Sequence, residues 1–110
     1  MEHPNLAFKV GKSLKFIAQN EIMYCMADGN YTDITLFDHS TVPTYKSLKE
    51  LENILDREYF VRVHNKYIIN LNYVTSYNDI NNNKLTLKDG TEVTMSRRKK
   101  IEFLARFHRL

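Results

Sequence analysis

The sequence predicts a mostly β domain, an α+β fold in which elongated antiparallel β-sheets carry two short helices. Its aromatic residues are seven Tyr and six Phe with no Trp, and together with many Val, Ile and Thr they favour strands over helices. Short apolar or alternating runs recur along the chain, as in strands that are partly or wholly buried. Between those runs lie clusters of turn-forming residues, which are Asp28-Gly29-Asn30, Asn81-Asn82-Asn83 and Asp89-Gly90.

The first half of the chain is predicted to form strands at 6–10, 14–18, 22–26, 32–37 and 41–43. The run 22–26 is continuously apolar, as expected of a strand that is buried on both faces. The turn after it joins it to 32–37 as a hairpin. Pro43 lacks a backbone N–H, so the last short strand is expected at a sheet edge.

A helix is predicted at 47–55. Ser47 and Glu50 form the S-x-x-E capping box, in which each side chain satisfies a backbone N–H at the start of the helix. An apolar stripe suited to covering a sheet is made by Leu48, Leu51, Ile54 and Leu55.

The second half repeats the order of strands followed by a helix. Strands are predicted at 59–63, 67–71, 73–77, 84–87 and 91–95. His64-Asn65-Lys66 interrupts the first two, and Asp89-Gly90 joins the last two as a hairpin. Ser96 is the predicted N-cap of a helix at 97–108. Its apolar or semi-apolar stripe would be Ile101, Leu104, Ala105 and His108.

No residue constellation argues for catalysis, so we expect no enzyme, no cofactor and no metal site. The four His, at 3, 39, 64 and 108, are not paired with one another or with Cys25 at metal-ligand spacing. Nucleophile-elbow, phosphate-loop and H-E-x-x-H patterns do not occur. Cys25 lies inside an apolar run with no adjacent base, which indicates a buried, inert thiol.

The expected location is the cytoplasm. The 110 residues suffice for one domain, and the single cysteine excludes an internal disulfide, which fits a reducing compartment. No secretory signal is visible at the start of the chain. No apolar stretch approaches the roughly 20 residues of a membrane-spanning helix, so no membrane partner is expected.

Positive charge is concentrated in the second half of the chain. Residues 1–60 carry six Lys or Arg and nine Asp or Glu, a net −3, whereas residues 61–110 carry ten and four, a net +6. The last 18 residues hold six basic residues and one acid, Glu102. This asymmetry indicates a polyanionic partner. A basic face that is merely solvated explains the charge alone equally well.

Two polar segments indicate that the polyanionic partner is a nucleic acid. His64-Asn65-Lys66 combines an imidazole, an amide and a cation, and Asn can bind base edges while Lys neutralises phosphate. The tract Ser96-Arg97-Arg98-Lys99-Lys100 places four cations at a predicted helix start, where the helix dipole disfavours them. Free N–H groups there suit a phosphate, and an Arg can read guanine bidentately. An Asn turn with an exposed Lys, and a capped basic helix, are the simpler alternatives.

At these residues the chain resembles the LytTR DNA-binding domain, the output module of many bacterial two-component response regulators. The resemblance covers about 13–105 and rests on four segments in order: IMYCMADGNYT (22–32), KSLKELE (46–52), FVRVHNKYIIN (60–70) and LKDGTEVTMSRR (87–98). It implies that residues 13–110 form the DNA-binding domain and that 1–12 are an N-terminal extension or linker remnant.

In this family loops, rather than a recognition helix, enter the DNA. The resemblance implies that Asn30-Tyr31 enters one major groove and that His64-Asn65-Lys66 lies near the intervening minor groove. Arg98, with Ser96, Arg97 and Lys99 beside it, would reach the next major groove. Lys46 and Ser47 would contact phosphates. For Tyr31, packing on the sheet is an equally good alternative.

The resemblance also implies a sequence-specific transcriptional regulator that binds direct repeats of double-stranded DNA as two copies. Such regulators usually carry an N-terminal receiver domain with a phospho-accepting Asp, which this sequence does not contain. The chain is then either one part of a longer regulator or a stand-alone one. Two other classes stay open: an RNA-binding β domain that stacks bases on Tyr31 and Tyr67, and a protein-interaction module with an incidental basic patch.

Overall fold

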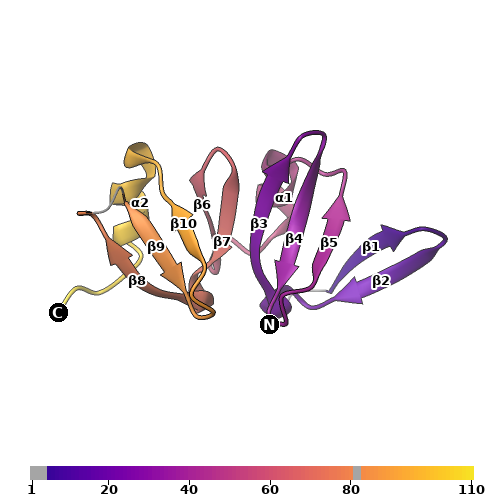
Figure 1. Cartoon of the computed structure of the whole chain (residues 1–110), viewed down its shortest axis with the longest axis horizontal. Coiled ribbons are helices and arrows are strands. Elements are labelled where there is room, and N and C mark those ends of the chain that lie inside the picture. Colours follow the sequence, from indigo (N-terminus) through magenta and orange to yellow (C-terminus); the bar gives the residue numbers. More distant parts are fainter. Residues whose placement is uncertain (1–4, 81–82) are drawn as a thin grey trace.

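The computed structural model describes residues 5–80 and 83–110, which form an elongated molecule of 47 × 34 × 24 Å. Three antiparallel sheets lie side by side along its length, with a short helix on each of two of them (Figure 1). The predicted α+β class, the antiparallel pairing and the two short helices are confirmed. Met1, His3, Pro4 and the first two residues of the predicted 81–83 turn lie outside the described residues.

The central sheet has five strands in the order β5-β4-β3-β7-β6. Their bounds are β3 Ile22–Asp28, β4 Tyr31–Leu36, β5 Thr41–Thr44, β6 Phe60–His64 and β7 Tyr67–Asn70. The hairpin predicted around Asp28-Gly29-Asn30 joins β3 to β4, and β5 with its Pro43 is an edge strand, as expected.

A smaller sheet stands on either side of the central one. A hairpin is formed by β1 Leu6–Val10 and β2 Ser13–Ile17. The other sheet, of order β10-β9-β8, is formed by β8 Val74–Asn78, β9 Lys84–Leu87 and β10 Glu92–Thr94. The helices are α1 Leu48–Ile54 and α2 Lys100–Leu104, and short 3₁₀ turns are η1 Gln19–Glu21, η2 Leu71–Tyr73 and η3 Arg97–Lys99.

The middle strands of the central sheet are covered on both faces. Neighbouring side chains of a strand point to opposite faces, and Ile68 and Ile69 of β7 accordingly enter two different hydrophobic clusters. One cluster lies under α1 and the β1–β2 hairpin and includes Phe8 and Leu51. The other lies against the β8–β10 sheet and α2 and includes Leu85 and Phe103. The continuously apolar run 22–26 is explained by this double burial.

The predicted C-terminal helix is wrong in length and in buried face, because it ends at Leu104. Ser96 is the N-cap residue of its first turn, as predicted, but the Ser96 side chain makes no capping bond. The first turn is the 3₁₀ turn η3, which has fewer residues per turn than an α-helix and so shifts the phase of the following turn. Phe103 is buried at 1% exposure, whereas Ile101 of the predicted stripe is 83% exposed. The predicted stripe members Ala105 and His108 are also exposed, and Leu104 is half-buried.

The first helix agrees more closely with its prediction. Both hydrogen bonds of the Ser47–Glu50 capping box are present, and Leu48, Leu51 and Leu55 are buried. Ile54 is the exception, at 45% exposure, because it ends the helix beside an open groove between α1, β1 and β5. In the part of the chain that the structure describes, neither helix has the length and apolar character needed to cross a bilayer.

The Cys25 thiol is wholly buried, and burial raises its pKa to about 12. In the unfolded chain the thiol ionises near pH 8.5. Between about pH 8.5 and 12 the folded state therefore binds the extra proton, so the stability of the fold falls as pH rises through this window, by about 1.4 kcal/mol per pH unit at most. We expect urea titrations from pH 8 to 10.5 to show a steeper decline for the native chain than for Cys25→Ala. Parallel declines would contradict this.

Candidate nucleic-acid interface

The segments that carry the sequence-predicted site residues lie on one long edge of the molecule, the upper one in Figure 1. We call this surface the loop edge and define it by four segments: the β3–β4 turn with Asn30 and Tyr31, the β5–α1 connection with Lys46 and Ser47, the β6–β7 turn with His64, Asn65 and Lys66, and the η3 tract with Ser96, Arg97, Arg98 and Lys99. Antiparallel hairpins in one sheet place alternate turns at the same end, which is why residues far apart in sequence meet here.

Backbone hydrogen bonds hold neighbouring segments of the loop edge together. The Ala27 N–H donates to the Lys66 carbonyl at 2.9 Å, which joins the end of β3 to the β6–β7 turn. The Ser96 N–H donates to the Val63 carbonyl at 2.8 Å, which joins the η3 tract to β6. The Ser96 amide is thus occupied by a backbone partner and is not among the N–H groups open to a phosphate.

The β3–β4 turn exposes Asn30 at its tip. Gly29 there has φ +60°, a left-handed conformation that a side chain would strain. Tyr31 is 41% exposed, and its ring packs edge-on against the Tyr45 ring with centroids 5.9 Å apart. The Tyr31 ring therefore already has a partner, while part of it still faces solvent.

The β5–α1 connection is shaped by the capping box. The Ser47 N–H donates to Glu50 Oε1 at 3.1 Å, and the Ser47 Oγ accepts from the Glu50 N–H at 3.1 Å. The Ser47 N–H lowers the pKa of the Glu50 carboxyl, with smaller help from Lys46, so the carboxylate stays ionised near neutral pH. Lys46 Nζ lies 3.7 Å from that carboxylate. Lys46 is therefore partly neutralised, and a hydrogen bond from the Ser47 side chain also helps to lower the pKa of the Glu50 carboxyl.

The β6–β7 turn has a defined conformation. The Lys66 N–H donates to His64 Nδ1 at 3.1 Å, so the neutral His64 ring carries its proton on Nε2. The His64 ring lies 5.9 Å from the Tyr67 ring. Asn65 and Lys66 are exposed, and the Lys66 ammonium makes no ion pair with any described residue. An amide and an unpaired cation are thus presented on a fixed turn.

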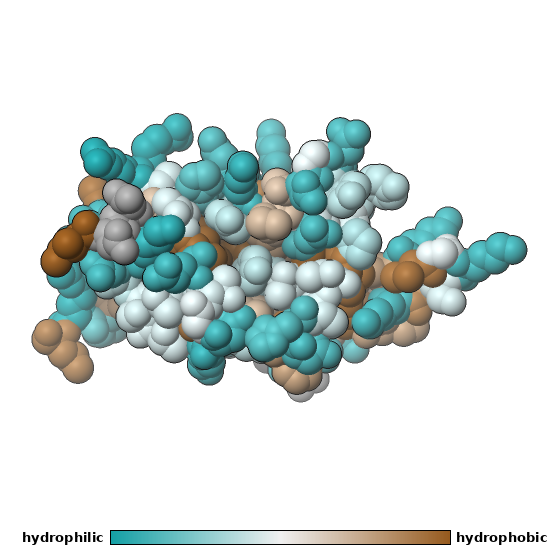
Figure 2. Space-filling model, in the orientation of Figure 1, coloured by the Kyte–Doolittle hydropathy of each residue, from teal (hydrophilic) through white to brown (hydrophobic). Residues whose placement is uncertain are grey.

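The basic tract divides into free and paired cations. Lys99 Nζ lies 3.9 Å from Glu102, and Lys100 Nζ lies 3.8 Å from Asp79 and over the Tyr77 ring. Arg97 and Arg98 are exposed, and neither guanidinium pairs with a described residue. Hydrophilic side chains project along this edge (Figure 2). The two arginines are therefore the cations of the tract that are open to an incoming anion.

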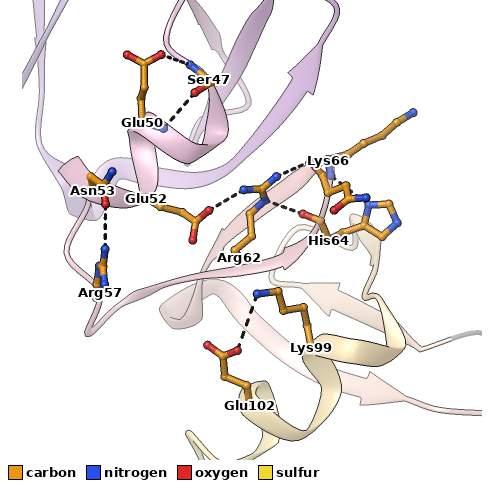
Figure 3. A network of polar contacts seen from close by, with 11 residues as sticks. Ser47, Glu50, Glu52, Asn53, Arg57, Arg62, His64, Lys66, Lys99 and Glu102 are labelled. Carbon is orange, nitrogen blue, oxygen red and sulfur yellow. Dashed lines mark hydrogen bonds and ion pairs between the residues drawn. The ribbon is translucent and has the colours of Figure 1, made fainter.

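One important residue was absent from the predicted site. Arg62 on β6 donates from Nε to the His64 carbonyl and from Nη2 to the Asn65 carbonyl, both at 2.8 Å. Its Nη1 contacts Glu52 Oε1 of α1 at 2.6 Å (Figure 3). Arg62 comes two residues before His64 and three before Asn65 in the sequence. This closeness to the turn is a signal that sequence inspection could have used. Its partner Glu52 comes from another element, so only the fold reveals it.

The described residues contain no group of three or more His, Cys, Asp or Glu side chains placed to hold a metal ion. They do form an open depression of about 670 Å³ where the β6–β7 turn meets the η3 tract. Among its lining residues are His64, Ser96, Arg97 and Lys100. This concave and largely polar surface suits a polyanion better than an apolar ligand.

Comparison with known proteins supports one kind of polyanion. The sequence profile of the LytTr DNA-binding domain matches residues 12–108. A solved structure, titled as the LytTr DNA-binding domain of a putative methyl-accepting/DNA response regulator from Bacillus cereus, superposes with a TM-score of 0.82. That match covers 94% of this chain and 95% of the other at 21% identity, which establishes the shared fold.

Two curated relatives show similarity in sequence. The sensory transduction protein LytT of Bacillus subtilis is 29% identical over 94 residues, which is 84% of this chain and 39% of LytT. The CO-responsive transcriptional regulator RcoM of Rhodospirillum rubrum is 38% identical over 69 residues, which is 62% of this chain and 28% of RcoM. This chain thus spans well under half the length of either relative.

Proposed function

The chain belongs to the LytTr DNA-binding domain family, and from this premise we propose that its loop edge binds double-stranded DNA sequence-specifically in transcriptional regulation. The observation that carries the proposal is that the predicted contact segments meet on one edge. That edge presents Lys66, Arg97 and Arg98 without carboxylate partners among the described residues. Unpaired cations in a row match the regular negative charge of a duplex.

The spacing of the segments supports insertion into successive grooves. The β3–β4 turn, the β6–β7 turn and the η3 tract follow one another along the loop edge (Figure 1). The molecule is 47 Å long, and successive major grooves on one face of a duplex lie about 34 Å apart. We place Asn30 and Tyr31 in one major groove, His64, Asn65 and Lys66 at the minor groove between, and Arg98 in the next major groove.

The remaining loop-edge residues are assigned to the phosphate backbone. Lys46 and Lys99 each share their charge with a nearby Glu, which suits a positioning contact better than base reading. The hydroxyls of Ser47 and Ser96 and the guanidinium of Arg97 are assigned in the same way, as is the Lys66 ammonium beside the minor groove. We also propose that the DNA bends on binding, because a straight duplex would not contact all three inserted loops equally well.

The names and greater lengths of the relatives support regulation by a further domain. We propose that the chain acts as the output domain of a two-component response regulator, attached to a receiver domain in a longer parent chain, and that two copies bind direct repeats. RNA stacking is less favoured, because the Tyr67 ring is half-buried and already contacts two other rings, with centroid distances of 6.4 Å to Tyr24 and 5.9 Å to His64.

Selection of bound duplexes from a random pool tests the function. The expected result is a defined sequence motif, with single-stranded RNA failing to compete in a gel-shift assay. Repeating the selection with Asn65→Ala and Arg98→Ala should relax preference at different positions of that motif. Recovery of unenriched sequence from the native chain would overturn the proposal.

The salt dependence of binding should identify Lys66 as a phosphate contact. Lys66→Ala is expected to weaken binding to specific and random duplexes alike, and to reduce the slope of log affinity against log salt by about 0.9. Fluorescence anisotropy at several salt concentrations measures this. Lys88→Ala is the matched control, because Lys88 lies over the Tyr73 ring and belongs to the β9–β10 turn, which is at the opposite edge of the molecule (Figure 1). An unchanged slope for Lys66→Ala would remove it from the interface.

A further inference from the structure

The carboxylate of Glu52 lies close to the proposed DNA surface without facing a free cation. It accepts a 2.6 Å hydrogen bond from Arg62 Nη1, and the Glu52 side chain is 38% exposed. Simple electrostatics gives such a carboxylate an unfavourable role, because it repels phosphate. Its contacts point to a favourable one.

Arg62 is engaged at each of its three side-chain nitrogens. Nε and Nη2 donate to the carbonyls of His64 and Asn65, and Nη1 donates to Glu52. The Arg62 side chain is only 22% exposed. A guanidinium is planar, so fixing one end of it against a carboxylate fixes the direction of the other donors. Arg62 is therefore placed to hold the turn rather than to touch DNA.

We propose that Glu52 and Arg62 are positioning residues for DNA recognition: Glu52 orients the Arg62 guanidinium, which fixes the backbone of the β6–β7 turn and so aims Asn65 and Lys66 (Figure 3). The inference rests on the proposed function, because it explains how one segment of the loop edge is held ready for DNA. It makes an acidic residue of α1 a contributor to the binding of a polyanion.

The sign of the effect of Glu52→Gln separates positioning from charge. Positioning predicts that specific affinity falls about tenfold, because a neutral amide holds the guanidinium less strongly than a carboxylate. The electrostatic alternative predicts that affinity rises, because one repulsive charge is lost. Anisotropy titrations with the selected duplex and with a random duplex give the specific and the non-specific affinity. A rise in specific affinity would overturn the proposal.

Glu102→Gln is the matched control. Glu102 is also a partly exposed acid paired with a loop-edge cation, Lys99, at 3.9 Å, but the Lys99 side chain, unlike that of Arg62, donates to no turn carbonyl of the described residues. Its removal frees Lys99 and is expected to raise affinity slightly for both duplexes. Opposite signs for Glu52→Gln and Glu102→Gln would support positioning. Equal increases would show that both acids act through charge alone.

A charge swap distinguishes an ordinary ion pair from a device that holds the turn. The double variant Glu52→Arg, Arg62→Glu restores an ion pair between α1 and β6, yet a carboxylate at 62 donates nothing to the His64 and Asn65 carbonyls. We expect no recovery of specific affinity in this variant. Recovery of the native specific affinity would show that the ion pair only joins α1 to β6, and it would refute the positioning role.

A readout without DNA keeps this inference separate from the function it rests on. Hydrogen exchange at the Lys66 amide, which is hydrogen-bonded to His64 Nδ1, should accelerate in Glu52→Gln and Arg62→Lys but not in Glu102→Gln. Thermal unfolding curves establish that each variant is folded at the assay temperature. If the native chain bound no duplex, the proposed function would fail while faster exchange still supported the link to the turn. Unchanged exchange would refute the link even if DNA bound.

Discussion

Replacing Phe103 with alanine is expected to lower the free energy of unfolding by about 3–5 kcal/mol, the usual cost of removing a fully buried aromatic side chain. Phe103 is 1% exposed and is the buried residue of α2. Its ring packs in the cluster that includes Val63 and Met95, and it lies 5.3 Å from the Phe107 ring. No other side chain of α2 is deeply enough buried to replace this anchor.

Ile101→Ala in the same helix is the control for Phe103→Ala. Ile101 is 83% exposed, so its truncation should change the free energy of unfolding by no more than about 0.5 kcal/mol. Urea denaturation followed by far-ultraviolet circular dichroism measures both. If Ile101→Ala cost as much as Phe103→Ala, the helix would bury the face that sequence periodicity suggested rather than the one described above.

Arg98→Ala is expected to lower affinity for the selected duplex by about 1–3 kcal/mol, the range for one bidentate contact to a base. The arginine is exposed and unpaired among the described residues, so its removal should leave the fold unchanged. The loss should be confined to one base position, and substitution of that base pair in the DNA should make native and variant proteins bind alike. Anisotropy with a panel of single-base variants measures this.

Arg109→Ala is the control for Arg98→Ala, because it removes the same charge from an exposed position outside the loop edge. Arg109→Ala should lower the binding affinity only slightly, and by the same amount for every duplex. Equal losses for Arg98→Ala on specific and random DNA would assign Arg98 to the backbone and leave the base reader to be sought at Arg97 or Asn65.

Local signals predicted most of the fold. The hairpin at Asp28-Gly29-Asn30, the edge position of Pro43 and the capping box of Ser47 depend on neighbours in sequence, and all three are confirmed. The C-terminal helix was mispredicted because the stripe Ile101, Leu104, Ala105 and His108 assumes a regular α-helix that continues to 108. The observed segment begins with a 3₁₀ turn and its α-helix ends at Leu104, so that stripe does not form.

The candidate site shows the same division. Residue types that bind DNA can be recognised one by one, so the exposed Asn30, Lys66 and Arg98 were identifiable as candidates. The residues that support those side chains could not be identified from sequence, because Glu52 and Arg62 are brought together by the packing of α1 on β6. Nor does sequence separate the unpaired Arg98 from the paired Lys100 two residues later, since Asp79 comes from the end of another strand.

The backbone bonds from Ala27 to Lys66 and from Ser96 to Val63 have a consequence for the kind of DNA that can be read. These bonds fix the distances between the segments of the loop edge, because hydrogen-bonded strands rather than flexible linkers separate those segments. One inserted base pair moves a contact by about 3.4 Å and turns it around the duplex axis, which a rigid frame does not follow. For the proposed mode of binding, we therefore expect the distance between contacted bases to affect affinity as strongly as the identity of those bases.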